Sequence, residues 1–334
     1  MSLPRILAFV LSVLLLAGGR VEAGERLDTI KARGFLTCGV GADVPGFSQR
    51  IERGAWRGFD VDLCEAMGAA IFGAPGKVAF KPIDTLETFL RDKDIDVVLR
   101  GLSWTFGREV AGQLRFGPVV LYDGQAFLVP KKLNLAAADA LSGKTICVST
   151  DAEFLTGLRT YFRQRSLILR AVIKDKRAQA SDAFFAGQCE AMSADASELA
   201  EALIGKAARA DDYVILPERI SKEPLAPLLR KGDDQFFDIV SWAMFALIDA
   251  EELGIEASNV ERMRSSDDPD KRAFFASPPV GSNGFSASWT FAIIKSVGNY
   301  GEIYQRNLGG PAKLQRGFNR LWTGGGLLYA PPIR

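Results

Sequence analysis

Hydroxyl and guanidinium side chains follow a short apolar run near residue 100. The run Ile95–Leu99 is typical of a buried strand, and Ser103, Thr105 and Arg108 come shortly after its end. A guanidinium group binds a carboxylate through two parallel N–H donors, and a neighbouring hydroxyl group adds a further hydrogen bond. These residue types therefore predict a loop that binds an anionic group of a small molecule.

Two more polar segments occupy similar positions later in the chain. STDAEF (149–154) and SADAS (193–197) each come at the end of a strand-like apolar run. Ligands of open parallel sheets bind at the carboxyl ends of strands, so these segments are expected to face the loop that carries Arg108. Asp195 supplies a carboxylate for an ammonium group. Together with Ser103, these side chains fit the zwitterion of an α-amino acid.

The elements that position these residues form two similar series. Strand-like and helix-like segments alternate at 34–99 and again at 144–217, which predicts an α/β fold with helices on the faces of parallel sheets. Extended runs at 123–130 and 221–233 join the two series, so we expect two lobes, a hinge and a cleft between them. The rest of the chain is expected to hold a long helix at 234–253, a polar surface excursion at 254–272, a helical stretch at 289–309 broken near Gly298, and an irregular tail.

Composition excludes several classes of function. The chain has 334 residues with 41 basic and 40 acidic side chains, so no basic field indicates nucleic-acid binding. It contains no histidine, which excludes nucleophilic catalysis by a Ser–His or Cys–His pair. No motif indicates a metal or a cofactor. Asp60 and Asp62 lie two positions apart in a predicted helix and are interpreted as helix caps, not as an acid–base pair.

The first 23 residues have the pattern of an export signal. Arg5 precedes the apolar run Ile6–Ala17, and small residues and then VEA (21–23), which resembles an A-x-A cleavage site, follow it. The run is about twelve residues long, whereas a helix that spans a bilayer needs roughly twenty. We therefore expect a cleaved signal and a mature chain that begins near Gly24. The alternative is a membrane anchor.

Several stretches make the chain resemble the periplasmic amino-acid-binding proteins of ABC transporters, in the polar amino-acid class. The similarity is greatest to the general L-amino-acid-binding branch. This resemblance implies the type II fold of periplasmic binding proteins, with two lobes, a mainly parallel sheet in each and a hinge of two crossing strands. It places lobe 1 at 24–125 and 225–334 and lobe 2 at 126–224. The stretches that carry it are CGVGADVPGFS (38–48), GFDVDLCEAM (58–67), SWTFGRE (103–109), YDGQAF (122–127), 220–255, VGNYGEIYQRNLG (297–309) and LYAPPIR (328–334).

The resemblance also implies roles for individual residues. The family's carboxylate-binding arginine corresponds to Arg108, its small polar partner to Ser103 with Gly101 before it, and its ammonium-binding acid to Asp195. Trp104 is expected to pack into lobe 1. The full set of expected ligand contacts is Phe47, Gly101, Ser103, Arg108, Thr150, Glu153 and Asp195.

One segment departs from the family's pattern. Where relatives have a Gly-Thr-Thr-like turn, this chain has Asp151, Ala152 and Glu153. In one interpretation, Glu153 faces solvent at a helix start that Thr150 or Asp151 caps. In the other, Glu153 faces the cleft, repels the ligand's carboxylate, and favours a cationic ligand or one whose carboxylate is displaced or missing.

The implied function is that of a periplasmic, monomeric solute-binding protein. It would bind an amino acid or a close relative by hinge closure and deliver it to an ABC permease in the inner membrane, without catalysis, cofactor or metal. Two alternatives stay open. One is a dehydratase-like enzyme on the same fold with Glu153 as its acid, and the other is a sensor that presents the closed form to a membrane receptor.

Four cysteines are expected to pair within lobes. In an exported protein an even number of cysteines suggests disulfides. Cys38 is expected to bond Cys64 and Cys147 to bond Cys189, because a bond between lobes would block closure. The alternative is four buried free thiols.

Overall fold

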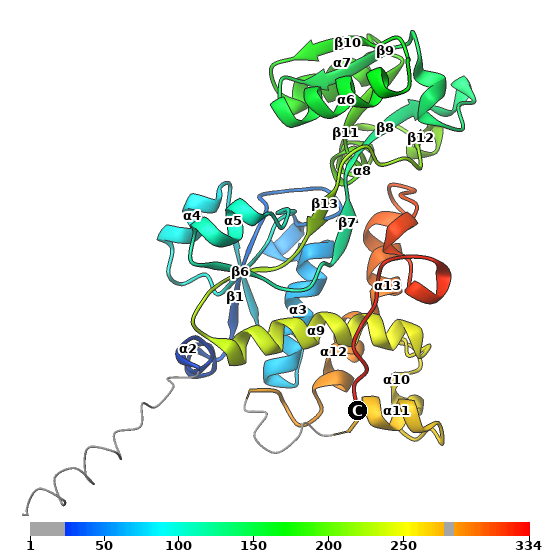
Figure 1. Ribbon diagram of the computed structural model, residues 1–334. Helices are drawn as coiled ribbons and strands as arrows, with labels where there is room; N and C mark the ends of the chain where they lie inside the picture. The colour runs from blue at the N-terminus through cyan, green and yellow to red at the C-terminus, as the bar shows by residue number, and fades with distance from the viewer. Residues whose placement is uncertain (1–23, 277–283) are drawn as a thin grey trace, which may run out of the picture.

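The computed structural model describes residues 24–276 and 284–334, and the predicted export signal at 1–23 lies outside these residues. Figure 1 shows two lobes, each built around a five-stranded sheet. The α/β fold with two lobes that the sequence predicts is confirmed. Within the described ranges, no helix combines the length and the apolar character that a membrane span requires.

The sheet of lobe 1 has the strand order β4-β1-β5-β14-β6. Its first three strands pair in parallel, and β14 lies antiparallel between β5 and β6. Helix α3 packs on this sheet and against α9 and α12, which come from the C-terminal part of the chain (Figure 1). The strands of this sheet are β1 (Leu36–Val40), β4 (Val78–Pro82), β5 (Val97–Leu99), β6 (Leu114–Phe116) and β14 (Leu228–Arg230). β2 (Gln49–Arg50) and β3 (Trp56–Arg57) form a separate antiparallel pair.

The helices of lobe 1 begin and end at recognisable signals. A Cβ atom at Gly58, before α3, would lie 2.1 Å from the Phe47 carbonyl oxygen, so this helix start requires glycine. Asp233 caps α9 by accepting a hydrogen bond from the Phe236 N–H, and Asn299 forms a capping box with Glu302 at the start of α13. The helices are α2 (Glu25–Arg33), α3 (Phe59–Phe72), α4 (Leu86–Arg91), α5 (Phe106–Ala111), α9 (Asp234–Glu252), α10 (Val260–Met263), α11 (Pro269–Phe274), α12 (Trp289–Val297) and α13 (Tyr300–Tyr304).

The segment at 254–272 lies on the surface, as predicted, and most of its residues are exposed or half-buried. The sequence did not predict the two short helices in this region, α10 and α11. Val260 and Phe274 are fully buried, so each short helix is held to lobe 1 by an apolar side chain in an otherwise polar sequence.

The sheet of lobe 2 has the order β10-β9-β11-β8-β12. Strands β9, β10 and β11 are parallel, whereas β8 is antiparallel to both of its neighbours, so both five-stranded sheets are mixed. The elements are β8 (Gln125–Pro130), β9 (Thr145–Ser149), α6 (Ala152–Gln164), β10 (Arg170–Lys174), α7 (Arg177–Phe185), β11 (Ala191–Asp195), α8 (Ala196–Lys206) and β12 (Tyr213–Ile215).

Two short strands connect the lobes. β7 (Leu121–Asp123) and β13 (Glu223–Leu225) form an antiparallel pair at the crossing (Figure 1). Gly124 follows β7 with a φ of 158°, and a Cβ atom there would lie 2.3 Å from the Ser221 carbonyl oxygen, so glycine lets the two chain segments run this close. We propose lobe boundaries at this crossing, with lobe 1 at 24–125 and 225–334 and lobe 2 at 126–224.

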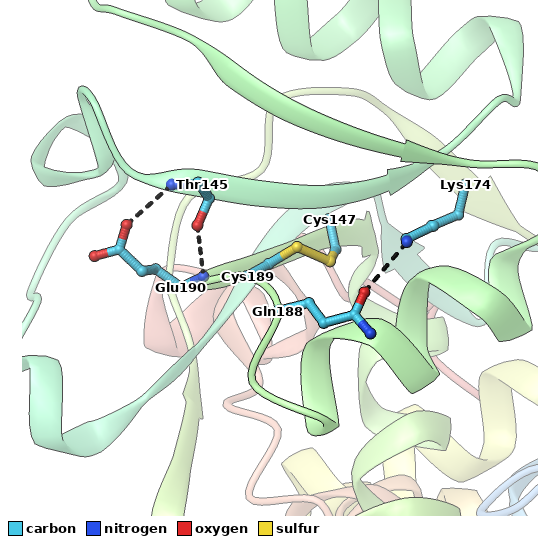
Figure 2. The surroundings of a disulfide bond; sticks show 6 residues. All are labelled: Thr145, Cys147, Lys174, Gln188, Cys189 and Glu190. Carbon is cyan, nitrogen blue, oxygen red and sulfur yellow. Dashed lines mark hydrogen bonds between the residues drawn. A yellow bond between two sulfur atoms is a disulfide. The ribbon is translucent and has the colours of Figure 1, made fainter.

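Both predicted disulfides are present, and each lies within one lobe. Cys38 bonds Cys64, and Cys147 bonds Cys189. Figure 2 shows the second bond linking β9 to the residues that lead into β11. Beside it, the Thr145 N–H donates to the Glu190 carboxylate at 3.0 Å and the Glu190 N–H donates to the Thr145 hydroxyl oxygen at 3.1 Å. The bond and these contacts tie neighbouring strands of lobe 2 together.

Candidate ligand-binding cleft

A cleft of about 1020 Å³ is lined by residues of both lobes and of the hinge. Six of the seven predicted contact residues line it, namely Phe47, Gly101, Ser103, Arg108, Glu153 and Asp195. Thr150 does not, because its hydroxyl group donates a 3.0 Å hydrogen bond to the Asp175 carbonyl oxygen outside the cleft.

The loop after β5 holds Arg108 toward the cleft. Gly101 has a φ of 64°, so the chain turns there in a left-handed conformation, and Ser103 is buried. Thr105 caps α5 by accepting a hydrogen bond from the Arg108 N–H at 3.4 Å. The Arg108 guanidinium donates to the Ser103 carbonyl oxygen at 2.8 Å. The loop thus fixes one side of the guanidinium group and leaves N–H donors for a ligand.

Trp104 lies on the outer side of this loop. Its ring stacks on Phe116 with the ring centroids 6.0 Å apart, and its indole N–H donates to the Glu109 carboxylate at 2.6 Å. Trp104 therefore lies against lobe 1 instead of being buried in it, with 39% of the residue exposed.

Asp195 occupies the end of β11 on lobe 2. Its Oδ1 atom is buried and has no hydrogen-bond partner among the described residues. Burial raises the pKa of Asp195 to about 8, with the negative charges of Asp123, Glu198 and Glu223 adding to the shift. A ligand ammonium group would satisfy the unpaired oxygen and offset this repulsion.

Arg177 neutralises part of the acidic wall of lobe 2. It donates to the Asp151 carboxylate at 2.7 and 3.2 Å, forms an ion pair with Glu198, and lies over the Phe154 ring at 5.1 Å from its centroid. Burial raises the pKa of Glu198 to about 7 despite this pairing. Because Arg177 already has two carboxylate partners, it is poorly placed to bind a third from a ligand.

Glu153 lies in the first turn of α6, and its exposed side chain lines the cleft. That this acid acts on a ligand stays a prediction. The predicted cap of α6 is absent: Asp151 is at the N-cap position, but its side chain makes no capping hydrogen bond because it pairs with Arg177.

A family model decides the class of this protein. The model described as bacterial extracellular solute-binding proteins, family 3, matches residues 36–255. The chain belongs to this family.

Two similar proteins extend the comparison to almost the whole chain. The general L-amino acid-binding periplasmic protein AapJ of Rhizobium johnstonii is 42% identical, over 97% of each chain. The glutamate/glutamine/aspartate/asparagine-binding protein BztA of Rhodobacter capsulatus is 39% identical, over 96% of each.

A solved structure agrees with this family 3 assignment. A periplasmic binding protein of an ABC transporter from Brucella ovis, with glutathione bound, is 40% identical. The match has a TM-score of 0.78 and covers 92% of this chain and 99% of that chain.

The sequence interpretation also missed Asp60 and Arg100 as cleft residues of this family 3 protein. Asp60 does not cap α3, because Gly58 holds the N-cap position; its buried side chain instead lines the cleft, where burial raises its pKa to about 7. Asp62 pairs with Arg306. Arg100, next to Gly101, also lines the cleft, and its Nε atom is buried without a hydrogen-bond partner in the described parts of the chain. The sequence could have indicated Arg100 as a cleft residue, because it directly precedes Gly101 of the predicted ligand loop.

The two walls of the cleft differ in charge. Arg100 and Arg108 line the side of lobe 1, where the acids are the buried Asp60 and, at the hinge, the buried Asp123. The lobe 2 side carries more acids than bases, namely Asp151, Glu153, Asp195, Glu198, Glu201 and Glu223 against Arg177 and Lys222. A molecule with carboxylate and ammonium groups is held best with its anionic end on lobe 1 and its cationic end on lobe 2.

The raised pKa of Asp195 predicts pH-dependent binding by this solute-binding protein. An ammonium group favours the carboxylate form, so binding must release the proton that Asp195 holds below about pH 8. We expect affinity to rise by up to about tenfold per pH unit toward pH 8 and to level off above it. Calorimetry in two buffers of different ionisation enthalpy measures the proton release, and Asp195→Asn should abolish it.

The same shift has a consequence for stability without ligand. Because the pKa of Asp195 is higher in the folded state than its ordinary 3.8, this group lowers stability as the pH rises from about 4 to about 8. An affinity that does not change between about pH 6 and pH 8 would contradict the expected pH-dependent binding, and an Asp195→Asn variant with the same pH dependence of unfolding as the unmutated protein would contradict the statement on stability.

Proposed function

We propose that the protein is a periplasmic receptor that binds an amino acid, or a compound with an amino-acid head group, and delivers it to an ABC permease of the inner membrane. We further propose that the mature chain acts by binding alone, without catalysis, and works as a monomer. The relatives support this assignment. Two are named as amino-acid-binding proteins, and a third is described as a periplasmic binding protein of an ABC transporter and was solved with glutathione, a compound that carries an amino-acid head group.

The observation that carries the proposal is the placement of Arg108 and Asp195 on opposite walls of one cleft. Arg108 binds the carboxylate of the ligand from lobe 1, and Asp195 binds its ammonium group from lobe 2. A ligand with both groups links the lobes, so it stabilises the closed form over the open one. Arg100 adds a second guanidinium group on lobe 1, so a carboxylate or amide beyond the head group also finds a donor.

A thermal-shift screen of the mature protein tests this function. Bound ligand raises the unfolding midpoint by mass action. We expect L-amino acids or glutathione to raise it, whereas amines without a carboxylate and dicarboxylates without an amine should have no effect, because each lacks one of the two charges. A shift produced equally by a simple dicarboxylate would exclude the proposed recognition of a zwitterion.

Glu153 is expected to limit the affinity for neutral amino acids. Its carboxylate lines the cleft, where it repels the carboxylate of the ligand. Glu153→Thr removes this charge and adds a hydroxyl donor, so calorimetry should show that a neutral amino acid binds about 1 kcal/mol more tightly, or roughly fivefold. Thr156→Ala, at another exposed cleft position of α6, is the control. An unchanged affinity in Glu153→Thr would show that this acid does not act on the ligand.

A further inference from the structure

The hinge includes more of the chain than the two strands β7 and β13, because two further segments form hydrogen bonds with them. In the pair of β7 and β13, Tyr122 lies opposite Pro224. Proline has no N–H to donate, so Tyr122 and Pro224 cannot form a doubly hydrogen-bonded pair, and their polar backbone groups must find partners elsewhere. Both partners come from segments outside β7 and β13.

Asn319 provides the partner on one side. The Tyr122 N–H donates to the Asn319 Oδ1 atom at 2.7 Å, and the Asn319 amide donates to the Tyr122 carbonyl oxygen at 3.0 Å. The Asn319 side chain is buried, with 5% of the residue exposed. It therefore takes the place of a third strand along β7, although it comes from the segment 315–319 near the C-terminus, called the C-terminal tail below.

The ligand loop provides the partner on the other side. The Trp104 N–H donates to the Pro224 carbonyl oxygen at 2.7 Å, and Ser103 forms an antiparallel bridge with Leu225. The hinge is thus a ribbon of four segments in the order of the C-terminal tail, β7, β13 and the loop that holds Arg108. The tail and the ligand loop form its two outer edges.

The tail is itself anchored to lobe 1. The Arg316 guanidinium donates to the Asn319 carbonyl oxygen at 2.9 Å and forms an ion pair with Glu251 of α9. The Tyr304 hydroxyl group donates to the Gln315 carbonyl oxygen at 3.2 Å. Residues 315–319 lie beyond the match to the family model, which ends at 255. The anchor is therefore not part of what that model describes.

We propose that Asn319 is a positioning residue that fixes β7 to lobe 1 and, across the ribbon, holds the ligand loop in the geometry that closure requires. This inference rests on the proposed binding of ligand by hinge closure. Without Asn319, the Tyr122 backbone loses both of its hydrogen bonds to this side chain. The hinge of the unliganded protein is then less constrained, so part of the binding free energy is used to order the hinge. Affinity falls although no residue that contacts the ligand has changed.

Asn319→Ala tests this role, with Asn299→Ala as the matched control. Asn299 is also a buried asparagine of lobe 1 that makes one donor and one acceptor bond to backbone groups, at Ile255 and Glu302, and neither partner belongs to the hinge strands. Both variants should lower the unfolding midpoint. Only Asn319→Ala should weaken binding of the best amino-acid ligand in calorimetry, by about tenfold. Asn319→Asp keeps the acceptor for the Tyr122 N–H, so its ligand affinity should lie between those of the unmutated protein and Asn319→Ala.

A distance measurement without ligand separates failure of this inference from failure of the proposed function. Spin labels at the exposed positions Lys31 in lobe 1 and Lys132 in lobe 2 report the opening of the hinge. Asn319→Ala should broaden their distance distribution and Asn299→Ala should leave it unchanged. Equal behaviour of the two variants would overturn the role of Asn319, whatever the ligand. If no amino acid binds the unmutated protein, the function fails while this test remains informative.

Discussion

Replacing Arg108 with alanine is expected to weaken amino-acid binding by roughly 30- to 5,000-fold. The change removes the guanidinium group that binds the ligand's carboxylate, and Asp195 alone must then hold the ligand. Removing one partner of a buried charge pair typically costs about 2–5 kcal/mol, and calorimetry of both proteins with the same amino acid measures this loss.

Two further variants make this result specific. Arg108→Lys keeps the charge but cannot donate two parallel hydrogen bonds, so its affinity should fall between those of the unmutated protein and Arg108→Ala. Arg115→Ala removes a surface arginine of lobe 1 that pairs with Asp234 outside the cleft, and it should leave binding unchanged. Unchanged binding by Arg108→Ala would mean that the ligand lies elsewhere or has no carboxylate.

Removal of the Cys147–Cys189 bond is expected to lower the free energy of unfolding by about 2–5 kcal/mol. The bond closes a loop over a sequence separation of 42 residues, and opening that loop increases the entropy of the unfolded chain. Both sulfur atoms belong to buried residues, so a double alanine variant is preferable to serine, which would bury a hydroxyl group. Urea unfolding with and without the substitutions measures the difference.

The Cys38–Cys64 bond of lobe 1 gives the comparison. Its sequence separation is 26 residues, so the chain-entropy model predicts a loss smaller by about 0.4 kcal/mol. Ligand affinity should change little in either double variant, because none of the four cysteines lines the cleft. A loss below about 1 kcal/mol for the pair in lobe 2 would show that the unfolded chain is already compact there.

Local patterns were sufficient to predict most elements and the main ligand contacts. The apolar runs that became β1, β5 and β9 are short, bounded by polar residues and fully or largely buried, so strand was the natural prediction. Arg108 and Asp195 were found because Arg108 lies shortly after the end of such a strand and Asp195 lies at the end of one. The antiparallel position of β14 was not predicted, because pairing between distant segments leaves no local pattern.

The contacts that the sequence did not reveal are between residues far apart in the chain. Arg177 belongs to α7, and only the folded lobe shows that it pairs with Asp151 and prevents that residue from capping α6. Asp60 looked like a helix cap because it lies in the first turn of α3, and its place in the cleft depends on how that helix packs. Asn319 lies in an irregular tail, where no periodic pattern distinguishes a buried side chain from an exposed one.

Strand β14 lies in the middle of the lobe 1 sheet, yet it comes after all of lobe 2 in the sequence. This arrangement limits the order in which the two lobes can fold as the chain emerges. Lobe 2 is continuous from β8 to β12 and has its own disulfide, so it can form before the rest of the chain arrives. Lobe 1 cannot, because β14 joins β5 to β6 and is made only after all of lobe 2. Until then, the edges of β5 and β6 that β14 covers stay unpaired, and unpaired strand edges can pair with other chains.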